Sequence, residues 1–228
     1  MRVSTGVRGF DELVDGGLPE NRLYIVSGPP GSGKTTFCAQ FITEGARQGE
    51  SCAYVTMHET EQEIVQDLST FDFGFEQAAT SGNLEFLNLV TEEGKRTLMH
   101  YGQDKGLSNR LVALIEQRNV SRVVIDSTML LQHFTDDPAK EITQFISMLK
   151  QTDATILLIS EMTDPTSYSE EHYLAHGVVF FHNFLDGGGM TRAVQIIKMR
   201  GTAIDCDMSA IEFSDGGLTV HPDEKVKG

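Results

Sequence analysis

The chain has 228 residues, of which 39% are hydrophobic and 22% charged, a composition typical of a soluble globular protein. Its 18 Lys and Arg residues face 33 Asp and Glu residues, so the net charge is −15, and no basic run marks a surface for a nucleic-acid backbone. The longest apolar runs, such as 154–159, are far shorter than the roughly 18 residues that a membrane span needs.

The three cysteines predict the cellular compartment of the chain. Cys38, Cys52 and Cys206 stand alone, in no C-x-x-C pair and in no histidine cluster. This spacing argues against a zinc site or a disulfide framework and predicts small buried side chains in a reducing compartment. The first residues lack an apolar signal core, so we expect a cytoplasmic protein.

In chain order, short aliphatic runs alternate with amphipathic segments of helical period. Strands are predicted over 22–27, 52–57, 123–126 and 154–160. Helices are predicted over 35–48, 61–68, 107–118 and 138–149. Apolar strands that alternate with helices predict a mostly parallel sheet with helices on both faces.

The last third of the chain changes character, because strand-like runs there surround glycine-rich turns. Runs 177–184 and 191–199 flank the first turn, and runs 210–214 and 218–220 flank the second. Each pair predicts an antiparallel hairpin. We therefore expect one α/β domain over residues 1–228, a mostly parallel sheet finished by C-terminal antiparallel hairpins.

The strongest local signal lies between the first predicted strand and helix. It is the octapeptide Gly28-Pro29-Pro30-Gly31-Ser32-Gly33-Lys34-Thr35, followed by Thr36. It matches the phosphate-binding pattern G-x-x-x-x-G-K-[ST]. Its glycines let backbone N–H groups and the helix N-terminus point at negative charge. We expect Lys34 to reach the β- and γ-phosphates of ATP and the Thr35 hydroxyl to hold Mg²⁺.

A loop of this kind also needs a carboxylate on a neighbouring strand to orient the magnesium ion. Asp126 ends the apolar run 123–126 and is expected to supply it. The alternative is an aspartate that only caps the end of a strand. Thr35 and Asp126 are therefore the predicted ligands of Mg²⁺.

Hydrolysis requires a group that orients or deprotonates a water molecule. Glu59 and His58, which follow the second predicted strand, are the candidates, and the imidazole could act only while neutral. The alternative is that Glu59 or Glu61 caps the next helix, where acids are favoured.

Several motifs in one order resemble the RecA superfamily of ATPases and, within it, the KaiC-like proteins. The matching segments are 4–13, 16–19, 28–36, 54–60, 159–161, 197–202 and 213–220. The resemblance implies a RecA-like P-loop NTPase core that forms a homo-oligomeric ring, typically of six copies, with ATP between copies. It also implies that Glu161 ends a sensor strand.

The same resemblance gives roles to Lys198 and Arg200, in the motif Lys198-Met199-Arg200-Gly201-Thr202. It implies that they reach in trans to the γ-phosphate held by a neighbouring copy. A cation at that place offsets charge that develops in the transition state. The alternative is a solvated pair of strand residues.

The chain departs from the family at two points. The usual pair of glutamates after the second strand is His58 and Glu59 here, so Glu59 acts as base, His58 acts instead, or hydrolysis is slow. Residues 171–174 correspond to the place where the clock-type kinase domain carries Ser/Thr acceptors, and they contain neither residue type. Autokinase activity is therefore not expected.

We expect a regulatory ATPase that binds Mg·ATP, releases ADP, assembles with itself and meets an unidentified protein partner. One alternative is a RecA/RadA-type recombinase paralogue acting on DNA. The net charge of −15 and the lack of Lys and Arg over 129–137 and 162–177 disfavour it. The other alternative is a nucleotide-binding pseudo-ATPase scaffold, which His58 supports.

Overall fold

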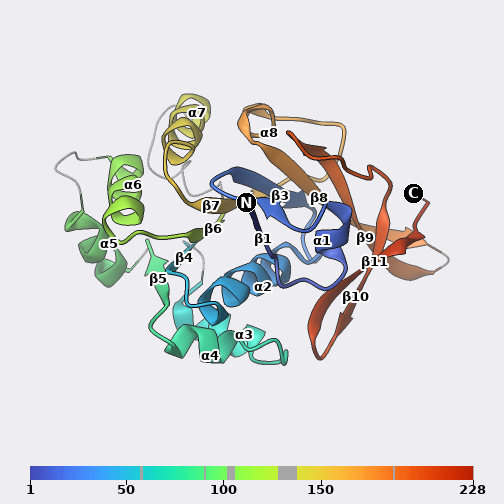
Figure 1. The fold of residues 1–228 in the computed structure, drawn as a ribbon, viewed down its shortest axis with the longest axis horizontal. Coiled ribbons are helices and arrows are strands. Elements are labelled where there is room, and N and C mark those ends of the chain that lie inside the picture. Colours follow the sequence, from blue (N-terminus) through green and yellow to red (C-terminus); the bar gives the residue numbers. More distant parts are fainter. Residues whose placement is uncertain (57–58, 90, 102–105, 128–137, 187, 228) are drawn as a thin grey trace.

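The computed structural model describes residues 1–56, 59–89, 91–101, 106–127, 138–186 and 188–227 (Figure 1). Within them, a nine-stranded sheet has the order β11-β10-β9-β8-β3-β7-β6-β4-β5. The strands from β8 to β5 run parallel, and β9, β10 and β11 continue the sheet in antiparallel fashion. The expected fold class is confirmed.

The parallel part is built from short, buried strands. They are β3 (Leu23–Gly28), β4 (Cys52–Thr56), β5 (Leu84–Asn88), β6 (Arg122–Asp126), β7 (Thr155–Glu161) and β8 (Gly177–Asp186). The antiparallel part consists of β9 (Gly189–Met199), β10 (Ser209–Ser214) and β11 (Gly217–Lys225). A separate two-stranded sheet pairs β1 (Arg2–Val3) with β2 (Leu18–Pro19).

Helices cover both faces of the large sheet (Figure 1). One face packs against α1 (Phe10–Leu13), α2 (Lys34–Arg47), α3 (Glu61–Leu68) and α4 (Phe75–Thr80). The other packs against α5 (Glu92–Met99), α6 (Leu107–Gln117), α7 (Pro138–Leu149) and α8 (Glu170–Leu174). Strand β3 shows why both faces must be covered, since Tyr24 and Val26 enter one core and Leu23 and Ile25 the other.

The predicted hairpins are present, with one difference in their role. Strand β8 pairs antiparallel with β9 but parallel with β3, so the first hairpin is joined to the main sheet. Its long strands therefore run beside the loop that follows β3, which places C-terminal residues next to the predicted phosphate site. Strand β5 and helices α1, α4, α5 and α8 lie outside the elements predicted from the sequence.

The cysteine prediction is correct at two positions and wrong at one. Cys38 and Cys52 are buried, whereas Cys206 is exposed because it lies between β9 and β10, outside the sheet. Among the described helices, none combines the length and the apolar composition that crossing a membrane requires.

The parallel register gathers several of the predicted site residues at one edge. Gly28 of β3 pairs with Glu161 of β7, and Thr56 of β4 pairs with Asp126 of β6. Because these parallel strands all end at the same edge, their last residues and the loops that follow lie close together.

Candidate functional site

The phosphate-binding loop connects β3 to α2, and two of its glycines are required by their surroundings. Gly28 and Gly33 have φ of 146° and 110°, which disfavours any residue with a side chain. A Cβ atom on Gly28 would collide with the Phe181 carbonyl oxygen, and one on Gly33 would lie 2.7 Å from Cζ of Phe213. These glycines therefore let the loop pack against the C-terminal hairpins.

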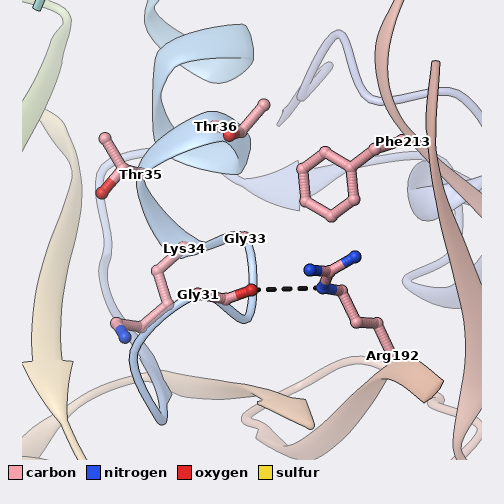
Figure 2. A pocket seen from close by; sticks show the side chains of 7 residues that line it. All are labelled: Gly31, Gly33, Lys34, Thr35, Thr36, Arg192 and Phe213. Atoms are coloured by element: carbon pink, nitrogen blue, oxygen red, sulfur yellow. Dashed lines mark hydrogen bonds between the residues drawn. The ribbon is translucent and has the colours of Figure 1, made fainter. Parts of the chain in front are cut away.

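Lys34 begins α2 and is 7% exposed. Its Nζ donates hydrogen bonds to the carbonyl oxygens of Gly28 and Pro29 at 2.8 and 3.0 Å. Burial lowers the pKa of Lys34, while the carboxylates of Glu161 and Asp126 act in the opposite direction. Figure 2 shows this side chain running back along the loop, away from Phe213. The ammonium therefore lies against the carbonyl groups of its own loop.

The structure brings together the two predicted magnesium ligands. Oγ1 of Thr35 lies 3.4 Å from Oδ2 of Asp126, and the buried Tyr54 donates its hydroxyl proton to the same carboxylate oxygen at 3.1 Å. Burial, together with the charge of Asp126, raises the pKa of Tyr54 well above its ordinary value, so the phenol keeps its proton. A hydroxyl and a carboxylate oxygen are ligands that suit Mg²⁺.

A further observation supports a phosphate ligand in the loop. Oγ of Ser32 is buried and has no hydrogen-bond partner in the described part of the chain. Buried hydroxyl groups are normally paired, so an orphaned one in a phosphate-binding loop fits a site that a ligand completes.

Glu59 follows β4 and is half-buried at the same edge of the sheet. Its carbonyl oxygen accepts a hydrogen bond from Nδ2 of Asn88 at 2.7 Å. The charge of Glu59 is the smallest of the causes that raise the pKa of Tyr54, after burial and Asp126. His58, the other candidate base, lies outside the described residues.

Neither Glu59 nor Glu61 caps α3. The residue that caps it is Thr60, whose Oγ1 accepts from the backbone N–H of Glu63, while the Glu63 carboxylate accepts from the backbone N–H of Thr60. Glu61 lies in the first turn of the helix. Thr60 is therefore the N-cap residue of α3, through a capping box with Glu63.

Lys198 and Arg200 lie at the end of β9 and just beyond it, away from the loop of their own chain. Lys198 donates to the carbonyl oxygens of His172 and Tyr173 at 2.8 and 3.1 Å, and Arg200 donates to that of Tyr173 at 3.0 Å. Burial, with repulsion from Arg200 and Lys150, lowers the pKa of Lys198 to about 8. Within one chain, these cations thus form a second basic site, against the carbonyl groups of α8.

Two residues for which the sequence predicted no role complete the phosphate site. A pocket of about 410 Å³ beside the loop is bounded on its far side by Arg192 of β9 and Phe213 of β10 (Figure 2). The Arg192 guanidinium lies 5.2 Å from the centre of the Phe213 ring, and its Nε donates to the carbonyl oxygen of Gly31 at 3.2 Å. Arg192 lies in no motif, and Phe213 begins the matching segment 213–220 without a predicted role; the pairing of β9 with β8 and β10 brings both to the loop.

A glycine-rich loop between a buried strand and a helix, with a lysine, a hydroxyl and a carboxylate converging on it, defines a P-loop nucleotide-binding protein. Residues 3–225 match the family described as "ATPase: KaiC". The chain belongs to this family of P-loop ATPases.

Individual relatives agree with this assignment. The chain is 30% identical over 229 residues to the circadian clock oscillator protein KaiC of Parathermosynechococcus lividus, covering 96% of this chain and 42% of that protein. It is 28% identical over 245 residues to a UPF0273 protein of Thermotoga maritima, covering 100% and 98%. A crystal structure of a KaiC-like protein from Pyrococcus horikoshii superposes with a TM-score of 0.78 at 27% identity, covering 97% and 99%. The chain thus spans less than half the length of the clock protein.

Proposed function

We propose that the chain binds Mg·ATP and hydrolyses it slowly between copies of itself in a homo-oligomeric ring, as a regulatory ATPase without autokinase activity. The observation that carries this proposal is the separation of two basic groups. Lys34 lies in the loop, whereas Lys198 and Arg200 are hydrogen-bonded to carbonyl groups of α8, outside the pocket of their own chain.

In this proposal the loop holds the triphosphate of ATP. Its backbone N–H groups and the N-terminus of α2 bind the phosphates, and Lys34 exchanges its two carbonyl acceptors for phosphate oxygens. The adenine ring lies on Phe213 and Arg192, which offer a flat aromatic and a flat cationic surface at the mouth of the pocket.

The Thr35 hydroxyl and the Asp126 carboxylate would hold Mg²⁺, and Tyr54 orients that carboxylate through its hydrogen bond. The bound ion supplies positive charge that neutralises the phosphate oxygens. Glu59 accepts the proton of the attacking water, since it lies at the same edge and is not used as a helix cap. His58 stands where the family usually has the first of its two glutamates, the likely base, so turnover is slow.

Lys198 and Arg200 act on the γ-phosphate in the next copy, as the resemblance to KaiC-like proteins implies. Two cations that donate to backbone carbonyls can exchange these acceptors for phosphate oxygens. Head-to-tail contacts of this kind close into a ring, for which we propose six copies.

The regulatory role follows from slow turnover and from relatives named as circadian clock proteins. A protein partner would recognise the state of assembly and the bound nucleotide, ATP or ADP. Autokinase activity is excluded from the proposal because the segment 171–174, in α8, carries no Ser or Thr acceptor.

Mixing two inactive chains tests the interface directly. Lys34→Ala removes ATP binding but keeps Lys198 and Arg200. Arg200→Ala keeps the phosphate loop but lacks the guanidinium group. We expect each variant alone to be nearly inactive. An equimolar mixture should regain turnover at interfaces where Arg200 of a Lys34→Ala chain reaches ATP bound by an Arg200→Ala chain. As a matched control, Lys95→Ala removes an exposed lysine that pairs with Glu92 in its own helix. A mixture as inactive as its parts, or an Arg200→Ala chain at the wild-type rate, would refute the proposal.

A further inference from the structure

Two buried serines lie side by side directly behind the phosphate site. Ser27 of β3 and Ser160 of β7 are 0% and 2% exposed, and they pair in register. Each directly precedes a residue of the site. Gly28 begins the loop, and the charge of Glu161 raises the pKa of Lys34. In a parallel pair, residues in register point to the same face of the sheet, so both hydroxyls face α8 rather than α2.

Both serines contact neighbouring residues of α8. Oγ of Ser160 donates to Oε1 of Glu171 at 3.2 Å, and Oγ of Ser27 lies 2.9 Å from Nε2 of His172. The backbone N–H of Ser169 donates to Nδ1 of the same imidazole at 3.2 Å, so Nδ1 is the acceptor and Nε2 carries the proton donated to Ser27. Burial lowers the pKa of His172, which keeps the ring neutral in this arrangement.

The same short helix holds the second basic site. The carbonyl oxygens of residues 172–174 accept hydrogen bonds from Lys198, Arg200 and Lys150. His172 therefore binds β3 through its side chain and Lys198 through its carbonyl group. Because α8 has five residues, a shift imposed at its serine contacts reaches these carbonyl groups within one turn.

The loop provides a switch at the other end of this connection. The Lys34 ammonium is bonded to the carbonyl oxygen of Gly28, the residue next to Ser27. A phosphate in the loop competes for this ammonium, so binding changes the hydrogen bonding at the end of β3. The path from Gly28 to Lys198 then runs through Ser27 and His172, each step a hydrogen bond or a peptide link.

We propose that α8 transmits the occupancy of a chain's own phosphate loop to Lys198 and Arg200, so that nucleotide binding changes how these cations are presented to the neighbouring copy. Ser27, Ser160, Glu171 and His172 are positioning residues in this relay. The inference rests on the proposed function for its consequence in a ring, but the relay itself lies within one chain and is measurable there.

Backbone hydrogen exchange tests the relay on dilute chains, at concentrations where sedimentation shows single copies. The probe is a non-hydrolysable ATP analogue with Mg²⁺, and the readout is exchange over residues 198–201, where the Arg200 N–H donates to the His176 carbonyl oxygen at 2.8 Å. We expect the wild-type rate to change about threefold or more on binding. Ser27→Ala and Ser160→Ala should reduce this change while binding the analogue within about twofold of wild type.

Ser209→Ala is the matched control, because it removes an equally buried serine hydroxyl from β10, away from α8. It should respond to the analogue as the wild type does. An unchanged wild-type segment, a full response in Ser27→Ala, or loss of analogue binding in Ser27→Ala would each overturn the relay. Failure of the mixing experiment with a normal exchange response would instead reject the action between copies and leave the relay within the chain.

Discussion

The ammonium group of Lys34 illustrates how the site is held ready at the scale of one residue. A buried ammonium is costly unless it is hydrogen-bonded, and here, on a residue that is 7% exposed, two carbonyl oxygens of its own loop replace water. Burial lowers the pKa of Lys34, and the charges of Glu161 and Asp126 act in the opposite direction. A triphosphate would offer a stronger, charged partner, which favours binding without rearrangement of α2.

Glu59 supports the sharpest prediction at this scale. Glu59→Gln keeps the size of the side chain and the hydrogen bonds of the backbone at this position. It removes the capacity of the side chain to accept a proton. We expect turnover to fall about 100-fold or more, with ATP affinity unchanged. Steady-state hydrolysis beside equilibrium binding measures both, and Glu61→Gln, in the exposed first turn of α3, is the matched control. A Glu59→Gln chain at the wild-type rate would transfer the role to His58 or Glu61.

The helices and strands differ in how well their sequences predict them. The unit β3–loop–α2 was predicted to within one residue at each end, because an apolar strand, a glycine-rich turn and an amphipathic helix are all local signals. Helix α8 gave none, since five residues are too few for a helical period. Strand β5 was also missed, because its buried positions do not alternate. Arg192 and Phe213 lie in predicted strand runs, but their place beside the loop depends on strand pairing, which is not a local signal.

The contact between the C-terminal strands and the loop makes a prediction about nucleotide recognition. Phe213→Ala removes the aromatic surface proposed to hold the adenine ring but leaves the phosphate-binding residues in place. We expect ATP affinity to fall about tenfold, or about 1.4 kcal/mol, by calorimetry. Inorganic tripolyphosphate is the matched ligand control and should bind the variant and the wild type equally. Equal loss for both ligands would show that Phe213 supports the loop rather than the base.

The junction of β3 and β8 predicts a pH dependence of stability. Nδ1 of His176 accepts a hydrogen bond from the backbone N–H of Leu23 at 3.1 Å. Burial, with the cations Lys150, Arg22 and Arg200, lowers the pKa of His176 from 6.5 to about 4. The folded state therefore disfavours the protonated ring, so this stability is present above pH 6.5 and is lost as the pH falls towards 4.

We expect His176→Asn, which cannot titrate, to lose less stability than the wild type between pH 6.5 and 4. The difference should be about 1 kcal/mol, since solvent screens this partly exposed group. Urea unfolding across that range measures it. His100→Asn, at an exposed position after α5, serves as control and should follow the wild type. Parallel curves for His176→Asn and the wild type would contradict the assigned pKa.

At the scale of the whole molecule, the net charge of −15 sets the conditions for assembly. Copies of an acidic chain repel one another, and salt screens this repulsion over about 10 Å at 0.1 M. A cationic site formed by Lys198 and Arg200 against a neighbour's phosphates would provide local attraction that depends on bound nucleotide. Assembly should therefore require Mg·ATP and strengthen from low to moderate salt.

The central claim is that the catalytic site is completed between copies. The measurement that tests it most directly is ATP turnover per chain over a range of protein concentrations, at low and at high salt, beside sedimentation with and without Mg·ATP. We predict that turnover per chain rises in step with the assembled fraction, and that both rise at lower protein concentration when salt is added. Turnover that is constant while the chain sediments as single copies, or full assembly without turnover, would contradict the account.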